Sequence, residues 1–352
     1  MNNLTAATSL RCALAAAGSL VSMSVAAQTT PTVDFYGSLR TQIEAVSPDN
    51  QDRLDSYTSV RDAYSRLGVK IDYPLSAGLA LTGHLEIPVD SANLRLRDSY
   101  DQGDSARPHG QRVRIGTVGL RGSAGSLAYG QQWMPYYNAI AAPVDMFSSY
   151  YSGFATYTVF RVDQAIAYST PEIGGLTLTA GYAPSSGNKR STSRIDASRK
   201  QLAAVYAFGD TRLAASVDDR GNAGYGRNRL FGLSASHQIG PVYLAAKYET
   251  FDTGNLRPGG FSSDGNQAVN LFGSYTAGAN TFKLMLARVE NYGDNIVHLG
   301  IDHRFTDKFK LFAEYYREGE TAALTPRRGG LNDFDASISG GHAVAVGIRL
   351  DF

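Results

Sequence analysis

The feature that most constrains this chain is an alternation of apolar with small or polar side chains, repeated in short segments along almost its whole length. The last eleven residues, HAVAVGIRLDF, show the pattern clearly. Successive side chains of a β-strand point to opposite faces, so Val344 and Ile348 share one face while Gly347 and Arg349 share the other. One face suits hydrocarbon and the other suits water. A strand of a soluble sandwich would alternate in the same way, so this segment alone leaves the fold open.

The N-terminal segment predicts export from the cytoplasm. Residues 1–27 contain one charge, Arg11, followed by the apolar run CALAAAGSLVSMSVAA and the polar QTT. This order is typical of a secretory signal peptide, with Val25 and Ala27 in the small-residue positions before a cut ahead of Gln28. A buried helix or a membrane anchor is the alternative, but the run is too short to span a hydrocarbon core of ~30 Å.

Cleavage at this point would leave one domain, residues 28–352, in an oxidising compartment. The only cysteine, Cys12, would leave with the signal peptide, so disulfides, cysteine catalysis and thiolate metal sites are not expected. The full chain has 33 Lys and Arg against 32 Asp and Glu. Loss of Arg11 brings the net charge to zero, so no bulk charge would attract nucleic acid.

The rest of the chain contains no apolar run of ~18 residues, the length expected of a membrane-spanning helix. The 37 Gly, 21 Tyr and 15 Phe indicate strands and turns instead. Membrane β-barrels have sequences of this kind because only every second strand residue meets lipid, which keeps the average hydropathy low.

About sixteen strands are predicted, and tight turns rich in Gly, Pro and Asp alternate with long polar stretches between them. That asymmetry is typical of a barrel with periplasmic turns at one rim and extracellular loops at the other. The strands are expected at 33–45, 65–73, 78–87, 113–122, 125–132, 162–170, 176–183, 200–209, 211–218, 230–238, 242–251, 267–276, 280–289, 295–305, 309–317 and the C-terminal segment. The long stretches are 46–63, 90–111, 133–161, 184–198, 219–227, 252–266, 290–295 and 318–341.

The predicted fold is therefore all-β: one 16-stranded antiparallel transmembrane barrel. Two soluble sandwiches are the alternative, and they would need an inter-domain linker that the sequence does not show. In the first strand, Val33, Phe35 and Ile43 are expected to face lipid, while Arg40 and Gln42 face water. Aromatic residues near outward strand ends are candidates for interfacial girdles, with core packing as the alternative for each: Tyr73, Tyr168, Tyr182, Tyr206, Phe208, Tyr248, Tyr275, Phe305 and Phe352.

The loop 133–160 is the longest aromatic-rich segment of the chain. It contains five tyrosines and a single charge, Asp145, and Arg161 follows it directly. A loop this apolar is poorly suited to bulk water. We expect it to fold into the barrel lumen and narrow the pore; an extracellular cap or a trimer contact is the alternative.

Several segments, in order along the chain, resemble the general porins of Gram-negative outer membranes, especially the beta-proteobacterial and neisserial type. VDFYGSLR is similar to the first strand of that family, SRLGVK to the second, and VGLRGSAGSLAYGQQ to the hairpin of the fourth and fifth strands. RVDQAIAYSTPEIGGL resembles the strand after the constriction loop, and LGIDHRFTDKFKLFAEYYR the penultimate hairpin. The ending VGIRLDF resembles the closing strand, whose final Phe352 would be the assembly signal read by the barrel assembly machinery.

The resemblance implies a homotrimer in which the third loop folds inward and opposes basic wall residues. By strand position, Arg40, Arg66 and Arg114 would form this ladder. The expected neighbours are Lys70, Arg112 and Arg161, and the expected loop residues are Asp145, Tyr136 and Tyr137. The sequence departs from the family where Gln131 or Gln132 replaces an arginine common in the fifth strand, which would shorten the ladder by one charge.

The predicted function is a water-filled outer-membrane channel for passive diffusion of small hydrophilic solutes and ions, with a weak preference for anions. Outer-membrane lipid and lipopolysaccharide would surround it, and no catalysis, cofactor, metal or nucleic acid is expected. A substrate-selective channel is the first alternative, with Tyr136, Tyr137, Tyr150 and Tyr151 as a stacking track for a sugar or an aromatic acid. A barrel hydrolase or a surface adhesin is the second.

Weaker signals were weighed against this prediction. The six histidines show no metal-ligand spacing, and His237 and His303 fall on outward or rim positions. Three aspartates, Asp218, Asp219 and Asp252, could bind a surface cation, and Arg327 and Arg328 could contact lipopolysaccharide phosphates. Solvated loop charges are the favoured interpretation of both groups.

Overall fold

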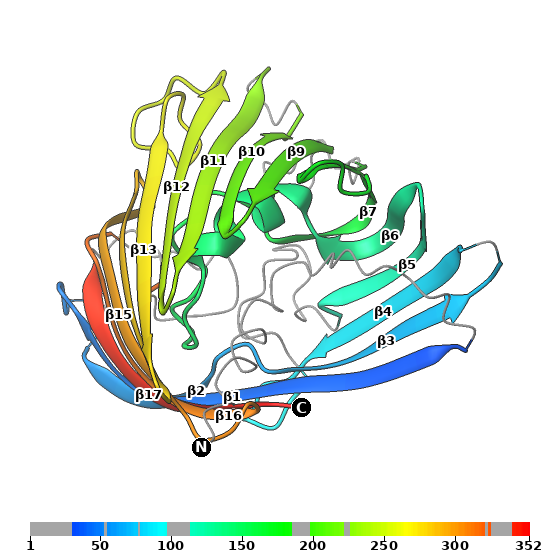
Figure 1. Cartoon of the computed structure of the whole chain (residues 1–352). Coiled ribbons are helices and arrows are strands. Elements are labelled where there is room, and N and C mark those ends of the chain that lie inside the picture. The colour runs from blue at the N-terminus through cyan, green and yellow to red at the C-terminus, as the bar shows by residue number, and fades with distance from the viewer. Residues whose placement is uncertain are drawn as a thin grey trace.

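The chain forms a single antiparallel sheet that closes on itself, as the computed structural model shows for residues 30–52, 55–76, 78–96, 113–184, 198–221, 226–320, 323–324 and 340–352 (Figure 1). The strands are β1 (Thr32–Pro48), β2 (Tyr57–Asp62), β3 (Arg66–Pro74), β4 (Ala80–Pro88), β5 (Ile115–Gly122), β6 (Gly125–Trp133), β7 (Arg161–Ser169), β8 (Leu176–Ala183), β9 (Arg199–Phe208), β10 (Thr211–Asp219), β11 (Asn228–Ile239), β12 (Val242–Thr253), β13 (Gln267–Ala277), β14 (Asn280–Val289), β15 (Gly293–Arg304), β16 (Phe309–Glu318) and β17 (Gly341–Asp351). From β3 onward each strand pairs with its sequence neighbour, β2 and β3 both pair with β1, and β1 pairs with β17 to complete the ring.

These strands occupy sixteen positions around the barrel, as predicted. Both β2 and β3 pair with β1, at opposite ends of that strand, so together they make one interrupted strand position. The expectation of a loop over 46–63 is wrong, because β1 continues to Pro48 and β2 begins at Tyr57. The alternation in YTSVRD is too short to stand out from a polar loop, and pairing with β1 is what holds it extended.

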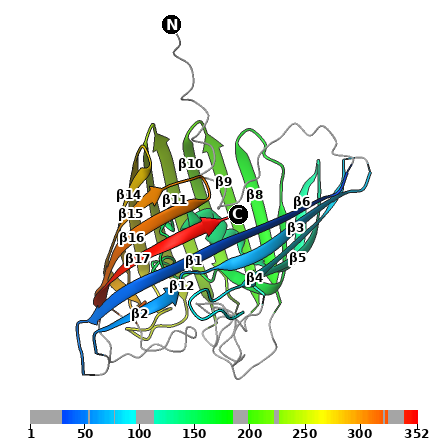
Figure 2. The ribbon, with the colours of Figure 1, turned by 90° about the horizontal axis from the view of Figure 1, so that it is seen from below.

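The two rims of the barrel differ, as the sequence indicated. Figure 2 shows short connections at one rim and the longer loops at the other. The short turns include 209–210 between β9 and β10 and 240–241 between β11 and β12. The strands lie obliquely, with β1 and β17 crossing the barrel wall at a marked slant (Figure 2). No helix within the described ranges is long and apolar enough to cross a membrane.

The outer face of the barrel is apolar and the inner face is polar. Val33, Phe35 and Ile43 of β1 are exposed on the outside, while Arg40 and Gln42 are buried on the inside. All nine aromatic residues predicted for the girdles are exposed, which excludes core packing as their role. The core of the molecule therefore lies in the lumen, where a loop packs against the inner wall.

The barrel closes where β17 meets the start of β1. The backbone N–H of Gly37 donates to the carbonyl of Phe352 at 2.9 Å, and the N–H of Phe352 donates to the carbonyl of Gly37 at 3.0 Å. The Phe352 ring lies over Gly37 and fills the place that a Cβ would need. The C-terminal residue thus covers a glycine of the first strand while half of its own surface faces outward.

The third loop, residues 134–160 (L3), folds into the barrel, as predicted. It begins with a π-helical turn, η1 (Tyr137–Ala141), and a 3₁₀ turn, η2 (Ala142–Val144). Both turns lie inside the ring beside β9 to β12 (Figure 1). Aromatic residues of L3 contribute much of the buried apolar cluster in the lumen. An extracellular cap is therefore excluded as the conformation of this loop.

Candidate functional site

L3 is held along the inner wall by polar side chains that bind its backbone. Side chains of four strands accept hydrogen bonds from its amides: Gln42 of β1, Gln201 of β9, Glu249 of β12 and Glu314 of β16. Five side chains from four strands donate to its carbonyls: Arg212 of β10, Ser234 of β11, Tyr243 and Lys247 of β12, and Lys283 of β14. This set satisfies the backbone of a loop that is buried away from bulk water.

L3 is accessible at Tyr137 and Asn138 and along one edge farther along the loop. Asp145, Met146, Ser152 and Gly153 keep part of their surface accessible, whereas 147–151 and 154–160 are buried. These four residues form the pore-facing edge of L3. None of the four is aromatic, and Met146 is the one large apolar side chain among them.

Asp145 is fixed in place by two hydroxyl groups of L3 itself. The Tyr137 hydroxyl donates to Asp145 Oδ2 at 2.9 Å, and the Ser152 hydroxyl donates to Oδ1. Burial raises the pKa of the Tyr137 phenol, and the neighbouring Asp145 charge raises it further. Tyr137 therefore stays neutral and keeps donating to the carboxylate at physiological pH. The Tyr137 ring stacks on Trp133 with 4.6 Å between centroids, and the Arg161 guanidinium lies 4.8 Å from the centre of the Trp133 ring, so Arg161 lies near this edge.

The three arginines of the predicted ladder lie together on the inner wall. Arg66 lies opposite Ser38 of β1 in register, and Ser38 is the residue that binds Arg40. Arg66 Nε lies 3.3 Å from Glu86 Oε2, and Arg114 Nε lies 2.9 Å from Glu86 Oε1. Arg40 donates from Nε to Ser38 Oγ at 2.8 Å, and no carboxylate lies within ion-pair distance of it among the residues that the structure describes.

The other predicted basic residues take different places. Lys70 is exposed, four residues along β3 from Arg66, with Nζ 5.2 Å from the centre of the Tyr36 ring. Arg161 is buried at the end of L3, with its guanidinium 4.8 Å from the Trp133 ring. Both flank the ladder without joining it. Arg112, like Arg327 and Arg328, lies outside the described residues.

Two features of this wall were missed by the sequence analysis. Glu86 is 4% exposed and bridges two ladder arginines, and its position on the inward face of β4 was visible in the alternation. Arg349 of β17 pairs across the seam with Arg40 in register, and its own charge is balanced by Asp351, whose Oδ2 lies 2.7 Å from Arg349 Nε. The wall is therefore less positive than the arginines alone suggest.

The expectation of a four-tyrosine stacking track is wrong. Tyr136, Tyr150 and Tyr151 are each at most 2% exposed, and only Tyr137 keeps an accessible surface. Tyr151 stacks on Tyr316 of the wall at 5.1 Å, and its hydroxyl donates to Glu44. These rings pack against the wall instead of lining the pore, because packing removes more of their apolar surface from water.

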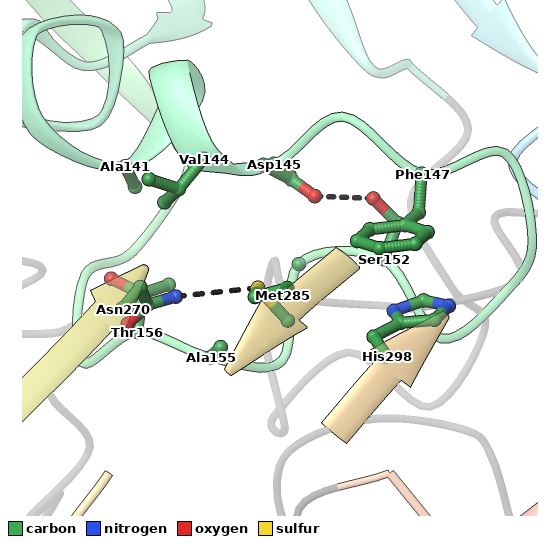
Figure 3. A pocket seen from close by; sticks show the side chains of 11 residues that line it. Ala141, Val144, Asp145, Phe147, Ser152, Ala155, Thr156, Asn270, Met285 and His298 are labelled. Atoms are coloured by element: carbon green, nitrogen blue, oxygen red, sulfur yellow. Dashed lines mark hydrogen bonds between the residues drawn. The ribbon is translucent and has the colours of Figure 1, made fainter. Parts of the chain in front are cut away.

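A small cavity lies between L3 and strands β13 to β15, and Asp145, Ser152 and Gly153 of the pore-facing edge are among the residues that line it (Figure 3). Its volume is about 20 Å³, room for about one water molecule. The Phe147 ring stacks on His298 of β15 with 3.5 Å between centroids (Figure 3). His298 Nε2 in turn lies 3.0 Å from Glu314 Oε2. This stack adds an aromatic anchor to the hydrogen bonds that hold L3.

The suggested surface cation site does not form. Asp218 is buried between Arg199 and Arg220, with Oδ2 2.7 Å from Arg199 Nη1. Asp252 and Asp219 pair with other arginines, Arg227 and Arg229 respectively. No group of three or more metal-ligating side chains occurs in the described part of the chain.

Comparison with known proteins was made at the level of sequence and of fold. The profile of a family described as Gram-negative porin matches residues 12–322. No curated protein sequence matches the chain. Among solved structures, the anion-selective porin from Comamonas acidovorans superposes with a TM-score of 0.70 at 18% identity, over 92% of this chain and 100% of that chain.

Two further solved structures have similar folds. OmpF from Salmonella typhi, in complex with daunomycin, gives a TM-score of 0.67 at 17% identity, over 91% of this chain and 97% of that one. The trimer form of OmpT, an outer-membrane protein of Vibrio cholerae, gives 0.60 at 18% identity, over 92% and 100%. At these identities the similarity concerns the fold.

Proposed function

The chain belongs to the Gram-negative porin family, and we propose that the outer-membrane channel it forms for passive diffusion of small hydrophilic solutes and ions prefers anions weakly. Family and fold are those of a channel rather than of an enzyme. The proposal is supported by the charges that meet where the pore-facing edge of L3 approaches the arginine ladder, a region that we call the constriction. The arginine ladder lies close to the edge of L3 that carries Asp145: Arg66 donates to the Tyr64 carbonyl at 3.3 Å, and the Tyr64 hydroxyl lies 3.3 Å from the Ser152 carbonyl.

The preference is weak because the constriction holds nearly equal charges. Arg40, Arg66 and Arg114 contribute three positive charges, while Glu86 and Asp145 contribute two negative ones. A net excess of one positive charge in a narrow opening with low-dielectric walls attracts anions and repels cations. The preference should weaken at high salt, because the Debye length falls to ~3 Å at 1 M ionic strength.

The test is the reversal potential of the purified protein in an uncharged planar bilayer across a KCl gradient. A potential of the sign given by chloride flow supports the proposal, and one of the sign given by potassium flow contradicts it. A bilayer with no conductance steps at all would instead contradict the channel itself. Saturable block of single-channel current by one solute would favour a substrate-selective channel.

Export and assembly are part of the same proposal. Cleavage after Ala27 would release residues 28–352 as the mature chain, and mass spectrometry of the N-terminus in outer membranes would test this. Phe352 would act as the signal for the barrel assembly machinery, in contact with outer-membrane lipid and lipopolysaccharide. Three equal conductance steps per insertion would support a homotrimer, and single steps would count against it.

A further inference from the structure

A hydrogen-bonded chain connects a histidine to the arginine ladder. The Tyr36 hydroxyl donates to Glu86 Oε2 at 2.8 Å and lies 2.6 Å from His84 Nε2. A phenol has one proton, so a Tyr36 that donates to Glu86 accepts from His84 through its oxygen. The carboxylate at the other end binds Arg66 and Arg114. His84 is thereby joined to two of the three ladder arginines through two side chains.

The chain is held in place by packing. The Tyr36 ring lies directly over Gly68 of β3, where any side chain would overlap it. Lys70 covers the ring with Nζ at 5.2 Å from its centre. Three adjacent strands therefore fix the phenol between His84 and Glu86.

We propose that His84 sets how the ion selectivity of the channel changes with pH, and that it acts on the arginine ladder through Tyr36 and Glu86. This inference rests on the proposed anion preference and adds the residue that adjusts it. Imidazole is the one side chain whose ordinary pKa, about 6.5, lies within the range pH 5 to 8. Protonation of His84 adds one positive charge beside a constriction whose excess is a single positive charge.

The groups that face His84 determine the pH at which its imidazole is protonated. Tyr36 of β1, Lys70 of β3 and Glu86 of β4 surround it, and its partner in register on β5 is Thr117, which carries no charge. The partial burial of the ring and the neighbouring Lys70 oppose a protonated imidazole, whereas Glu86 favours it. The accepting oxygen of Tyr36 favours the protonated form as well, because a hydrogen bond to a charged donor is the stronger one.

The other described histidines are placed differently. His298 is buried behind L3, and His237 and His303 are exposed and bonded to Thr211 and Asn280, their register partners on the neighbouring strands. His342 lies near the long-loop end of β17, 6.0 Å from the Tyr315 ring. His84 is thus the histidine of the described chain that reaches the ladder.

The experiment measures the reversal potential of the full mature protein in an uncharged bilayer between pH 8 and pH 5.5. For the unchanged protein, we expect the anion-to-cation permeability ratio to rise about twofold as the pH falls, from one added charge at a few ångströms in salt solution. His84→Gln, which can still donate to Tyr36, should give a ratio that does not change with pH. His237→Gln is the control and should keep the full response.

Tyr36→Phe tests the connection itself. Loss of the accepting oxygen should move the midpoint of the response to lower pH by about half a unit or more. A response that survives in His84→Gln would overturn the assignment of His84, and an unchanged midpoint in Tyr36→Phe would overturn the role of Tyr36. A cation-preferring channel whose selectivity still responds through His84 would contradict the proposed anion preference and leave this inference standing.

Discussion

At the level of single residues, one carboxylate, Glu86, lowers the net positive charge that the arginine ladder presents to the pore. Glu86 is almost fully buried, and it needs both Arg66 and Arg114 to offset the cost of its desolvation. The same pairing lowers the charge that a passing anion meets. Arg40, which has no such partner in the described chain, is left as the cation with the least local compensation.

Arg40→Gln should therefore shift the channel strongly toward cations, because it removes the whole excess of positive charge at the constriction. The measurement is the reversal potential in a KCl gradient at neutral pH. The matched control is the double variant Arg66→Gln with Glu86→Gln, which removes one charge of each sign and should stay close to the unchanged protein. Equal shifts in both variants would show that net charge is not what governs selectivity.

At the scale of elements, the interruption between β2 and β3 is a second anchor for L3. Tyr64 adopts a left-handed backbone conformation with φ of 68°, which is uncommon for a residue with a side chain. Asp62 Oδ2 accepts from its N–H at 2.9 Å and stabilises this conformation. The Tyr64 ring stacks on Tyr150 of L3 at 5.6 Å, and its hydroxyl donates to the Tyr150 carbonyl at 2.6 Å. The interruption between β2 and β3 thus directs the Tyr64 side chain toward L3.

The anchor formed by Glu249 should matter most for the stability of L3. Its carboxylate accepts from the Thr156 hydroxyl at 2.8 Å and pairs with Lys247, and both charged side chains are fully buried. Glu249→Gln leaves Lys247 buried without its counter-charge, so we expect the free energy of unfolding to fall by about 3–5 kcal/mol. The open-channel current should also become noisier as L3 loosens. Thermal unfolding followed by circular dichroism and single-channel recording would measure the two effects.

The ion pair between Asp72 and Arg121, near the short-turn rim, offers the control for this prediction. Asp72 pairs with Arg121 at a partly exposed position on the same inner wall. Asp72→Asn should cost only ~0–1 kcal/mol, because exposed ion pairs contribute little, and it should leave the current quiet. If Glu249→Gln behaves like Asp72→Asn, the buried pair is not an anchor of the loop.

At the scale of the whole molecule, stability depends on closing the ring. A barrel without closure would leave the edges of β1 and β17 unpaired in hydrocarbon, where each unsatisfied backbone group costs several kcal/mol. The seam joins Ser38 to Asp351 and continues to Pro48 opposite Gly341. Its last pair is Gly37 with Phe352, so Phe352 completes the backbone hydrogen bonding of the seam.

Deletion of Phe352 should impair assembly before it alters conductance. The variant loses two backbone hydrogen bonds at the seam and the ring that covers Gly37, while the constriction is untouched. The measurement is the fraction of heat-modifiable, folded protein in outer membranes, followed by the conductance of the molecules that do assemble. Phe305→Ala, which removes an exposed aromatic residue from a short turn, should assemble normally. Normal assembly of the deletion variant would contradict the role of Phe352.

The sixteen strand positions, the face that each strand presents to lipid, the asymmetry of the rims and the inward course of L3 could be predicted from the amino-acid sequence. These follow from side-chain alternation and from composition, which are local properties of a chain. The folded barrel was needed to reveal that Glu86 bridges Arg66 and Arg114, that Tyr36 reaches His84, and that most of the L3 tyrosines face the wall. Those contacts join residues far apart in sequence, and they depend on the register and slant of neighbouring strands, which alternation alone does not fix.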